Sequence, residues 1–226
     1  MKKIQRIPAL LLAMLMLFSL TLTSCGSKED IASPDQVAVA LFDMILKNDA
    51  STAVELFGYA DEAEARKDMG LEDNIYDELA EQLVSEMEGG STEDARAVVD
   101  AFMNMFKDVT LTAKVKESDE KAGTAVVTCT INTFESGAMD NILQQIMTDI
   151  MSDETLLSAD EATLYSAIIN KMAEGLSALT PTENTADFDV NFELVKADIN
   201  GKEKSVWLPV DVEEFGALIS NTALGE

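Results

Sequence analysis

The sequence predicts an α+β fold in which a curved antiparallel sheet of about four or more strands packs against helices. Apolar residues recur at the 3.6-residue spacing of helices over most of the chain. In two regions, residues 109–134 and 188–210, this spacing changes to the alternation that is typical of strands. With 226 residues, 47% of them hydrophobic, the chain is long enough for one domain of ordinary size.

Residues 1–24 have the layout of a secretory signal peptide. Lys2, Lys3 and Arg6 precede an apolar run over residues 7–22. This run is interrupted by polar residues and is shorter than the roughly 18 apolar residues of a permanent spanning helix. We therefore expect the leader to be cleaved. Residues 25–32, which begin with Cys25, follow the leader and are expected to form a short, flexible polar spacer.

The leader ends in Leu22-Thr23-Ser24-Cys25, which resembles the lipobox of bacterial lipoproteins. The resemblance implies cleavage between Ser24 and Cys25, a diacylglyceryl group on the Cys25 thiol, and acylation of the new amino terminus, for example with palmitate. Two acyl chains hold a protein stably at a bilayer, whereas one chain holds it only marginally. The expected location is the extracytoplasmic face of the cell membrane. The alternative is an ordinary signal peptide followed by an incidental Cys.

A single domain over residues 33–226 is expected to begin with helices. Ser33-Pro34-Asp35-Gln36 is a capping box with Pro at the first helical position, and a second, short helix runs from Ser51 to Phe57. A polar connection over residues 61–70 leads to a helix over residues 74–87. Ser91 then caps a further helix, with Asp94 at its third position.

Two hairpins are expected, with a helical insertion between them. The first hairpin covers residues 109–134, and the insertion covers residues 137–180, where Ser158 is expected to cap the second helix. The second hairpin turns at Asn200-Gly201, which is a strong turn signal. A final helix from Glu213 completes the domain, and its apolar residues are expected to point inward.

The order of elements is similar to that of extracytoplasmic lipoproteins with a nuclear transport factor 2-like fold. The resemblance depends on the opening of the first helix at residues 33–37, the break at Asn48-Asp49-Ala50 and the later long hairpins. It implies a curved sheet wrapped around helices, in a superfamily that includes both enzymes and binding domains. The helical insertion departs from this pattern, and the Asp-His pairs of the enzymatic members cannot form because the chain has no His.

Charge and composition exclude several functions. The chain has 42 acidic and 16 basic residues, a net charge of -26, so it repels nucleic acids. The absence of His removes Ser-His and Cys-His nucleophile pairs and imidazole zinc sites. No phosphate-binding loop and no Cys pair with metal spacing is present. We therefore expect no catalytic residues, no cofactor and no metal site.

Three groups of residues have both a structural and a functional interpretation. Cys129 lies on an apolar strand face, which favours a small buried hydrophobe over a reactive thiol. Asp187, Asp189, Asn191 and Glu193 alternate along a strand, and their expected role is a solvated face, with a weak cation site as the alternative. The acidic stretch over residues 61–81 is expected to be solvated as well.

The methionines and the single tryptophan have structural and functional interpretations. Methionines on predicted helices are expected to pack in the core, with a soft groove for a peptide or an apolar ligand as the alternative. Trp207 is expected to pack under the last helix, with a pocket or a partner surface as the alternative. The methionines in question are Met44, Met87, Met103, Met105, Met139, Met147, Met151 and Met172.

The sequence favours a membrane-anchored, non-catalytic module that binds a small molecule, a peptide or another envelope protein. The first alternative is a His-free hydrolase of envelope glycans that uses two carboxylates of unequal pKa. Two buried carboxylates about 5–10 Å apart would indicate such an enzyme. The second alternative is a structural accessory subunit.

Overall fold

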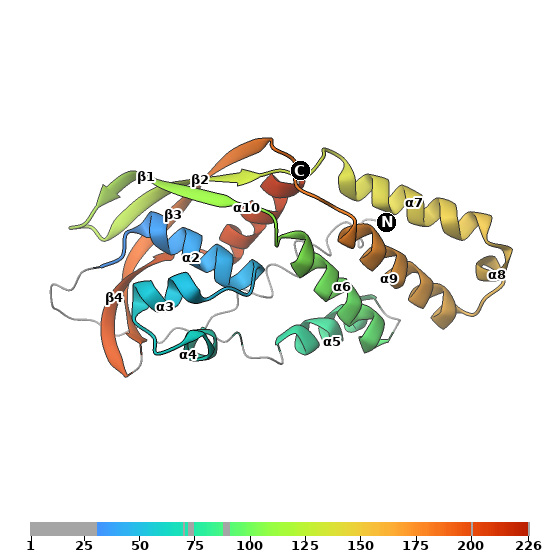
Figure 1. Ribbon diagram of the computed structural model, residues 1–226, viewed down its shortest axis with the longest axis horizontal. Coiled ribbons are helices and arrows are strands. Elements are labelled where there is room, and N and C mark those ends of the chain that lie inside the picture. Colours follow the sequence, from blue (N-terminus) through green and yellow to red (C-terminus); the bar gives the residue numbers. More distant parts are fainter. Residues whose placement is uncertain (1–30, 70, 72–74, 88–90, 200, 226) are drawn as a thin grey trace.

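The computed structural model describes residues 31–69, 71, 75–87, 91–199 and 201–225. In these ranges the protein has an α+β fold with one four-stranded antiparallel sheet in the order β1-β2-β3-β4. The prediction of an α+β fold with an antiparallel sheet is confirmed. The sheet lies at one end of the molecule, and a group of helices extends away from it at the other end (Figure 1).

Helices come first in the described chain. Ser33 and Gln36 act as predicted at the start of the first helix, because Gln36 Oε1 accepts a hydrogen bond from the Ser33 backbone N–H at 3.1 Å. Gly58 ends the second helix in a left-handed conformation with φ 75°. The helices before the sheet are α2 (Pro34–Leu46), α3 (Ser51–Phe57), α4 (Glu62–Asp68), α5 (Ile75–Met87) and α6 (Thr92–Met105).

Helix α4 corrects one prediction. Residues 61–70 were expected to form a polar connection, but Glu62–Asp68 is helical. The Asp61 side chain caps this helix by accepting the Glu64 backbone N–H at 2.9 Å, and basic residues lie in its last turn. Capping and favourable charge placement therefore stabilise a helix that buries only Ala65.

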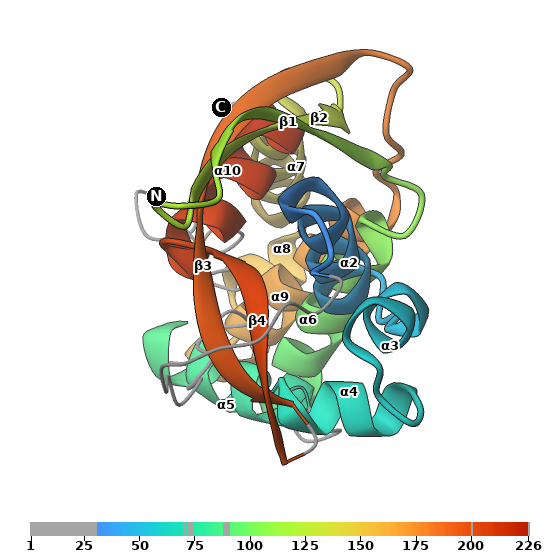
Figure 2. The same ribbon diagram turned by 90° about the vertical axis from the view of Figure 1, so that its left-hand side faces the viewer.

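The sheet consists of two hairpins, β1 (Leu111–Asp119) with β2 (Thr124–Asn132) and β3 (Thr185–Ile199) with β4 (Lys202–Pro209). Strands β2 and β3 pair with each other and join the hairpins into one sheet. Figure 2 shows that the sheet is strongly curved. Helix α2 contacts β1 and β2, and α10 (Val212–Leu224) contacts β2 and β3.

Strand β3 changes its buried face part-way along. In its first half Phe188 and Phe192 are buried, with ring centroids 6.5 and 6.4 Å from that of Phe215 on α10. In its second half Ala197 and Ile199 are buried instead, near residues of α3 and the end of α4. The predicted alternation is thus confirmed for residues 188–192, but it does not continue with the same face buried.

Helices α7 (Ala138–Ser152), α8 (Glu154–Leu157) and α9 (Glu161–Ser177) lie between β2 and β3, and we term them the helical arm. The arm leaves and returns at paired positions. The Thr133 N–H donates to the Asn184 carbonyl at 2.9 Å, and the Thr182 N–H donates to the Thr133 carbonyl at 2.8 Å. Helix α9 packs against α6 (Figure 1), where Ser166 and Asn170 donate hydrogen bonds to Asp94.

The start of α9 differs from the prediction. Asp160, and not Ser158, caps α9, because the Asp160 carboxylate accepts the Thr163 backbone N–H at 2.8 Å. Ser158 instead ends α8, a four-residue helix that was not predicted from the sequence. The Ser158 hydroxyl donates back to the Glu154 carbonyl at 3.0 Å, which is typical of a helix end.

Candidate functional site

A groove of about 530 Å³ separates α7 from α9 in the helical arm, and we term it the arm groove. Its floor is apolar: Ile142 and Ile146 of α7 are 9% and 6% exposed, and Leu179 follows α9. Its rim is polar and includes Asn141, Gln145 and Thr180. The arm groove therefore offers apolar contact area and several hydrogen-bonding groups.

Gly175 sets how closely α7 and α9 approach. A Cβ at this position would lie 2.7 Å from Ile142 Cγ2, closer than side chains normally approach. Only glycine lets Ile142 pack directly on the α9 backbone at this point. Gly175 thus joins the two helices at the floor, while the rim above them stays open.

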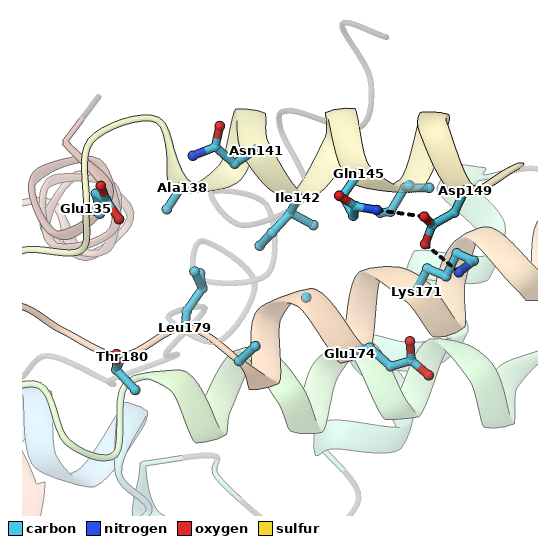
Figure 3. Close-up of a pocket in the computed structure, with 13 residues that line it drawn as sticks. Glu135, Ala138, Asn141, Ile142, Gln145, Asp149, Lys171, Glu174, Leu179 and Thr180 are labelled. Carbon is cyan, nitrogen blue, oxygen red and sulfur yellow. Dashed lines mark hydrogen bonds and ion pairs between the residues drawn. The ribbon is translucent and has the colours of Figure 1, made fainter. Parts of the chain in front are cut away.

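One end of the arm groove contains an ion pair. Lys171 Nζ lies 2.7 Å from Asp149 Oδ2, and Gln145 Nε2 donates to Asp149 Oδ1 at 2.6 Å (Figure 3). The hydrogen bond from Lys171, followed by that from Gln145, lowers the pKa of Asp149. The same bond to Asp149 raises the pKa of Lys171. Both groups are therefore charged at neutral pH.

Two further carboxylates give the arm groove a negative charge. Glu135 and Glu174 are exposed, and they lie toward opposite ends of the groove (Figure 3). Among the described residues that line the groove, Lys171 is the only cation, and Asp149 already neutralises it. The net result is an apolar middle between acidic ends.

The predicted lipid site lies outside the described residues. Ser24 and Cys25 belong to the range 1–30, so lipidation at Cys25 and cleavage before it stay predictions. In the described part of the chain every helix is too short or too polar to span a bilayer.

Cys129 is a buried hydrophobe, as predicted. It is 0% exposed, and burial raises the pKa of its thiol to about 12. A thiol in this state holds its proton at neutral pH and is shielded from reagents.

The acidic face of β3 is solvated, as predicted. Asp187, Asp189, Asn191 and Glu193 are all exposed. Asp189 pairs with Lys116 at 2.5 Å and accepts the Thr128 hydroxyl at 2.6 Å. In the residues that the structure describes, no group of three or more acidic, Cys or His side chains is arranged to hold a metal ion.

The acidic stretch over residues 61–81 forms surface ion pairs where it is described. Glu62 pairs with Arg66 at 2.8 Å, and Asp77 pairs with Arg96. Glu72 and Asp73 lie outside the described residues. The remaining acids of this stretch are half-buried or exposed, which agrees with a solvated surface.

The methionine prediction is correct for some positions and wrong for others. Met44, Met105, Met139 and Met172 are buried, as expected for core packing, and Met103 is half-buried. Met147 and Met151 of α7 are instead 50% and 69% exposed. None of these residues lines the arm groove, and the Met87 side chain lies outside the described residues.

Trp207 is 5% exposed and lines a cavity of about 180 Å³ that also includes Ile31, Val37 and Phe57. This agrees with the pocket interpretation of Trp207. The arm groove itself was not predicted from the sequence. Its one local signal was Gly175 inside a helical pattern, since an interior glycine costs helix stability and often has a packing reason.

Comparison with known proteins identifies one similar structure, and no family model or curated protein matches the sequence. The fold is similar to that of the protein ycdA from Bacillus subtilis subsp. subtilis str. 168, described as a "putative lipoprotein". The TM-score is 0.54 with 17% sequence identity, and the similarity covers 84% of this chain and 56% of ycdA. The chain thus spans little more than half the length of ycdA. At this identity the similarity shows a shared fold.

Proposed function

We propose that the protein is a lipid-anchored, non-catalytic binding module at the extracytoplasmic face of the cell envelope, and that the arm groove is its binding site. The lipobox at residues 22–25 and the fold similarity to ycdA support the anchored location. The arm groove is the observation on which the binding role depends.

The dimensions and lining of the arm groove suit a ligand. Its volume of about 530 Å³ lies within the range of roughly 300–1,000 Å³ that ligand pockets occupy. An apolar floor with a few polar groups at the rim is the usual composition of such sites. Each wall comes from a regular helix, so the lining is held on rigid elements.

The carboxylates favour binding over glycan hydrolysis. A His-free hydrolase needs one carboxylic acid with a raised pKa next to an ionised one. Every Asp and Glu whose side chain the structure describes is half-buried or exposed. Asp149, the acid of the arm groove that has polar partners, has a lowered pKa and a paired cation.

We also propose that the domain is nuclear transport factor 2-like. The helix pair α2–α3 beside a strongly curved antiparallel sheet supports this assignment, and the helical arm is then an insertion between its second and third strands. An experimental structure with a different strand order would contradict it.

The anchor is tested by mass spectrometry of protein extracted from the membranes of its native host. We expect a chain that begins at Cys25 and carries diacylglyceryl and acyl groups. A Cys25→Ser variant should lose the lipid and leave the membrane fraction. An unmodified Cys25 thiol in the native protein would contradict the proposal.

The binding site is tested by photo-crosslinking in the native host. A photoreactive phenylalanine analogue replaces Ala178, an exposed residue that lines the arm groove. The same analogue at Ser177, the exposed last residue of α9 that precedes Ala178 and does not line the groove, is the matched control. We expect a discrete crosslinked product from position 178 only. Equal background from both positions would show that the groove is empty in the cell and would favour the accessory-subunit alternative.

A further inference from the structure

We infer that the occupant of the arm groove is a basic, amphipathic peptide segment of another envelope protein. This inference rests on the proposed function of the groove and adds the chemical class of its ligand. It follows from three features of the described residues: the charges at the two ends, the apolar floor between them, and the charge of the whole chain.

The ends of the arm groove select for positive charge. Glu135 and Glu174 face solvent, and among the described residues of the lining one cation, Lys171, stands against these two carboxylates and Asp149. The charge of Lys171 is offset by Asp149, 2.7 Å away, and by the nearby Glu174. An anionic ligand would therefore meet a groove with excess negative charge, whereas lysine or arginine side chains would be attracted to the exposed carboxylates.

The middle of the arm groove selects for apolar side chains. Ile142, Ile146 and Leu179 form a floor that a small hydrophilic cation would leave uncovered. A small apolar molecule would cover the floor and leave the end carboxylates unused. A peptide with apolar residues between basic ones uses both, because it can follow the length of the two helices.

The net charge of the chain acts in the same direction. A charge of -26 attracts cationic segments and raises their rate of encounter, and this attraction weakens as salt is added. Overall charge does not discriminate among positions on the surface, so the local charges of the groove must be tested separately from it.

The probe is the fluorescently labelled peptide KKALLSALLSKK, compared with EEALLSALLSEE and QQALLSALLSQQ. Binding to the full chain, purified in nonionic detergent, is followed by fluorescence anisotropy, with empty micelles as the blank. We expect saturable binding of the lysine peptide that weakens with salt, and at least tenfold weaker binding of the glutamate peptide. The variant Ala178→Trp should abolish this binding by filling the groove, and Ser177→Trp should not.

Charge variants separate the groove from the rest of the surface. Glu135→Gln with Glu174→Gln should weaken the lysine peptide by about five- to tenfold, the loss expected for two exposed ion pairs. The control is Glu117→Gln with Glu120→Gln, two exposed residues of the β1–β2 hairpin that change the net charge equally. This control should leave the affinity within about twofold.

The outcomes distinguish this inference from the proposed function. If the glutamate or glutamine peptide binds best and Ala178→Trp blocks it, the groove is a binding site for another ligand class, and the inference fails alone. If both double variants weaken the lysine peptide equally, the peptide senses only net charge, and the inference also fails. Crosslinking at position 178 still decides separately whether the groove is occupied in the cell.

Discussion

Gly175 of α9 lies against Ile142 of α7, and a Cβ at position 175 would come within 2.7 Å of Ile142 Cγ2. A glycine inside a helix costs about 1 kcal/mol relative to alanine. Its position in α9 is explained by this contact, because α7 is held to the rest of the arm mainly by α9. The contact also defines the floor of the arm groove.

Gly175→Ala is expected to destabilise the protein by about 1 kcal/mol, because overpacking of about 1–3 kcal/mol exceeds the gain in helix propensity. In an Ile142→Ala background the same substitution should stabilise, since the obstructing methyl groups are gone. Urea unfolding of the two single variants and the double variant measures this coupling. A stabilising Gly175→Ala in the wild-type background would show that α7 does not pack on α9 at this point.

The pair of Asp149 and Lys171 is expected to hold the end of α7 against α9 across the neutral pH range. The pKa of Asp149 is lowered from 3.8, so its stabilising contribution is present above that value and is lost as the pH falls through the lower folded-state pKa. The pKa of Lys171 is raised from 10.5, so its contribution is present below that value and is lost at higher pH.

Hydrogen exchange of the α7 amides measures this effect. Protection should be constant from pH 5 to 9, after correction for intrinsic rates, and should fall below about pH 4. The variant Lys171→Met should show reduced protection at neutral pH and a weaker response to acid. Identical acid profiles in the two proteins would mean that the ion pair does not hold α7.

The cap of α9 provides a test of the corrected helix boundary. Asp160→Ala should lower the midpoint of urea unfolding, because the Thr163 backbone N–H loses its partner. Ser158→Ala removes only a hydroxyl that bonds within the preceding turn, so its midpoint should stay close to that of the wild type. A larger effect of Ser158→Ala than of Asp160→Ala would indicate that Ser158, and not Asp160, caps α9.

Cys129 is expected to be chemically silent in the folded protein. With a thiol pKa of about 12 and 0% exposure, it should react with iodoacetamide at pH 8 only after the chain unfolds. A Cys25→Ser background leaves Cys129 as the single thiol for this measurement. Rapid labelling of Cys129 without denaturant would show that the buried face of β2 is accessible to solvent.

Local sequence signals predicted most of the fold. The caps at Ser33 and Ser91 and the change of period near residue 109 placed helices and strands close to their observed bounds. Helix α4 was missed because its stability comes from its cap and its charges, and it has almost no apolar stripe. The prediction that Ser158 caps α9 was wrong because two residues that can cap a helix, Ser158 and Asp160, lie two positions apart. The helix begins after the second of them, Asp160.

Features that depend on tertiary contacts were not predictable in the same way. The change of buried face along β3 reflects which helices cover each half of the strand, and no single-strand pattern encodes that. Met147 and Met151 were expected in the core because they lie on a predicted helix, but their side chains are 50% and 69% exposed. The arm groove arises only where α7 and α9 meet, so its residues are separated along the chain.

The helical arm begins and ends at paired residues of β2 and β3, and this arrangement affects how the chain folds. Asn132 of β2 pairs with Thr185 of β3. The two ends of the helical arm must therefore come together before β2 and β3 can pair next to it. Pairings between residues far apart in sequence form slowly, because the entropy of closing the intervening loop is lost first. Helices that form early within the arm shorten the distance between its ends. Pairing of β2 with β3 is therefore expected to be the slow step of folding. Substitutions that speed formation of the arm helices should increase the folding rate.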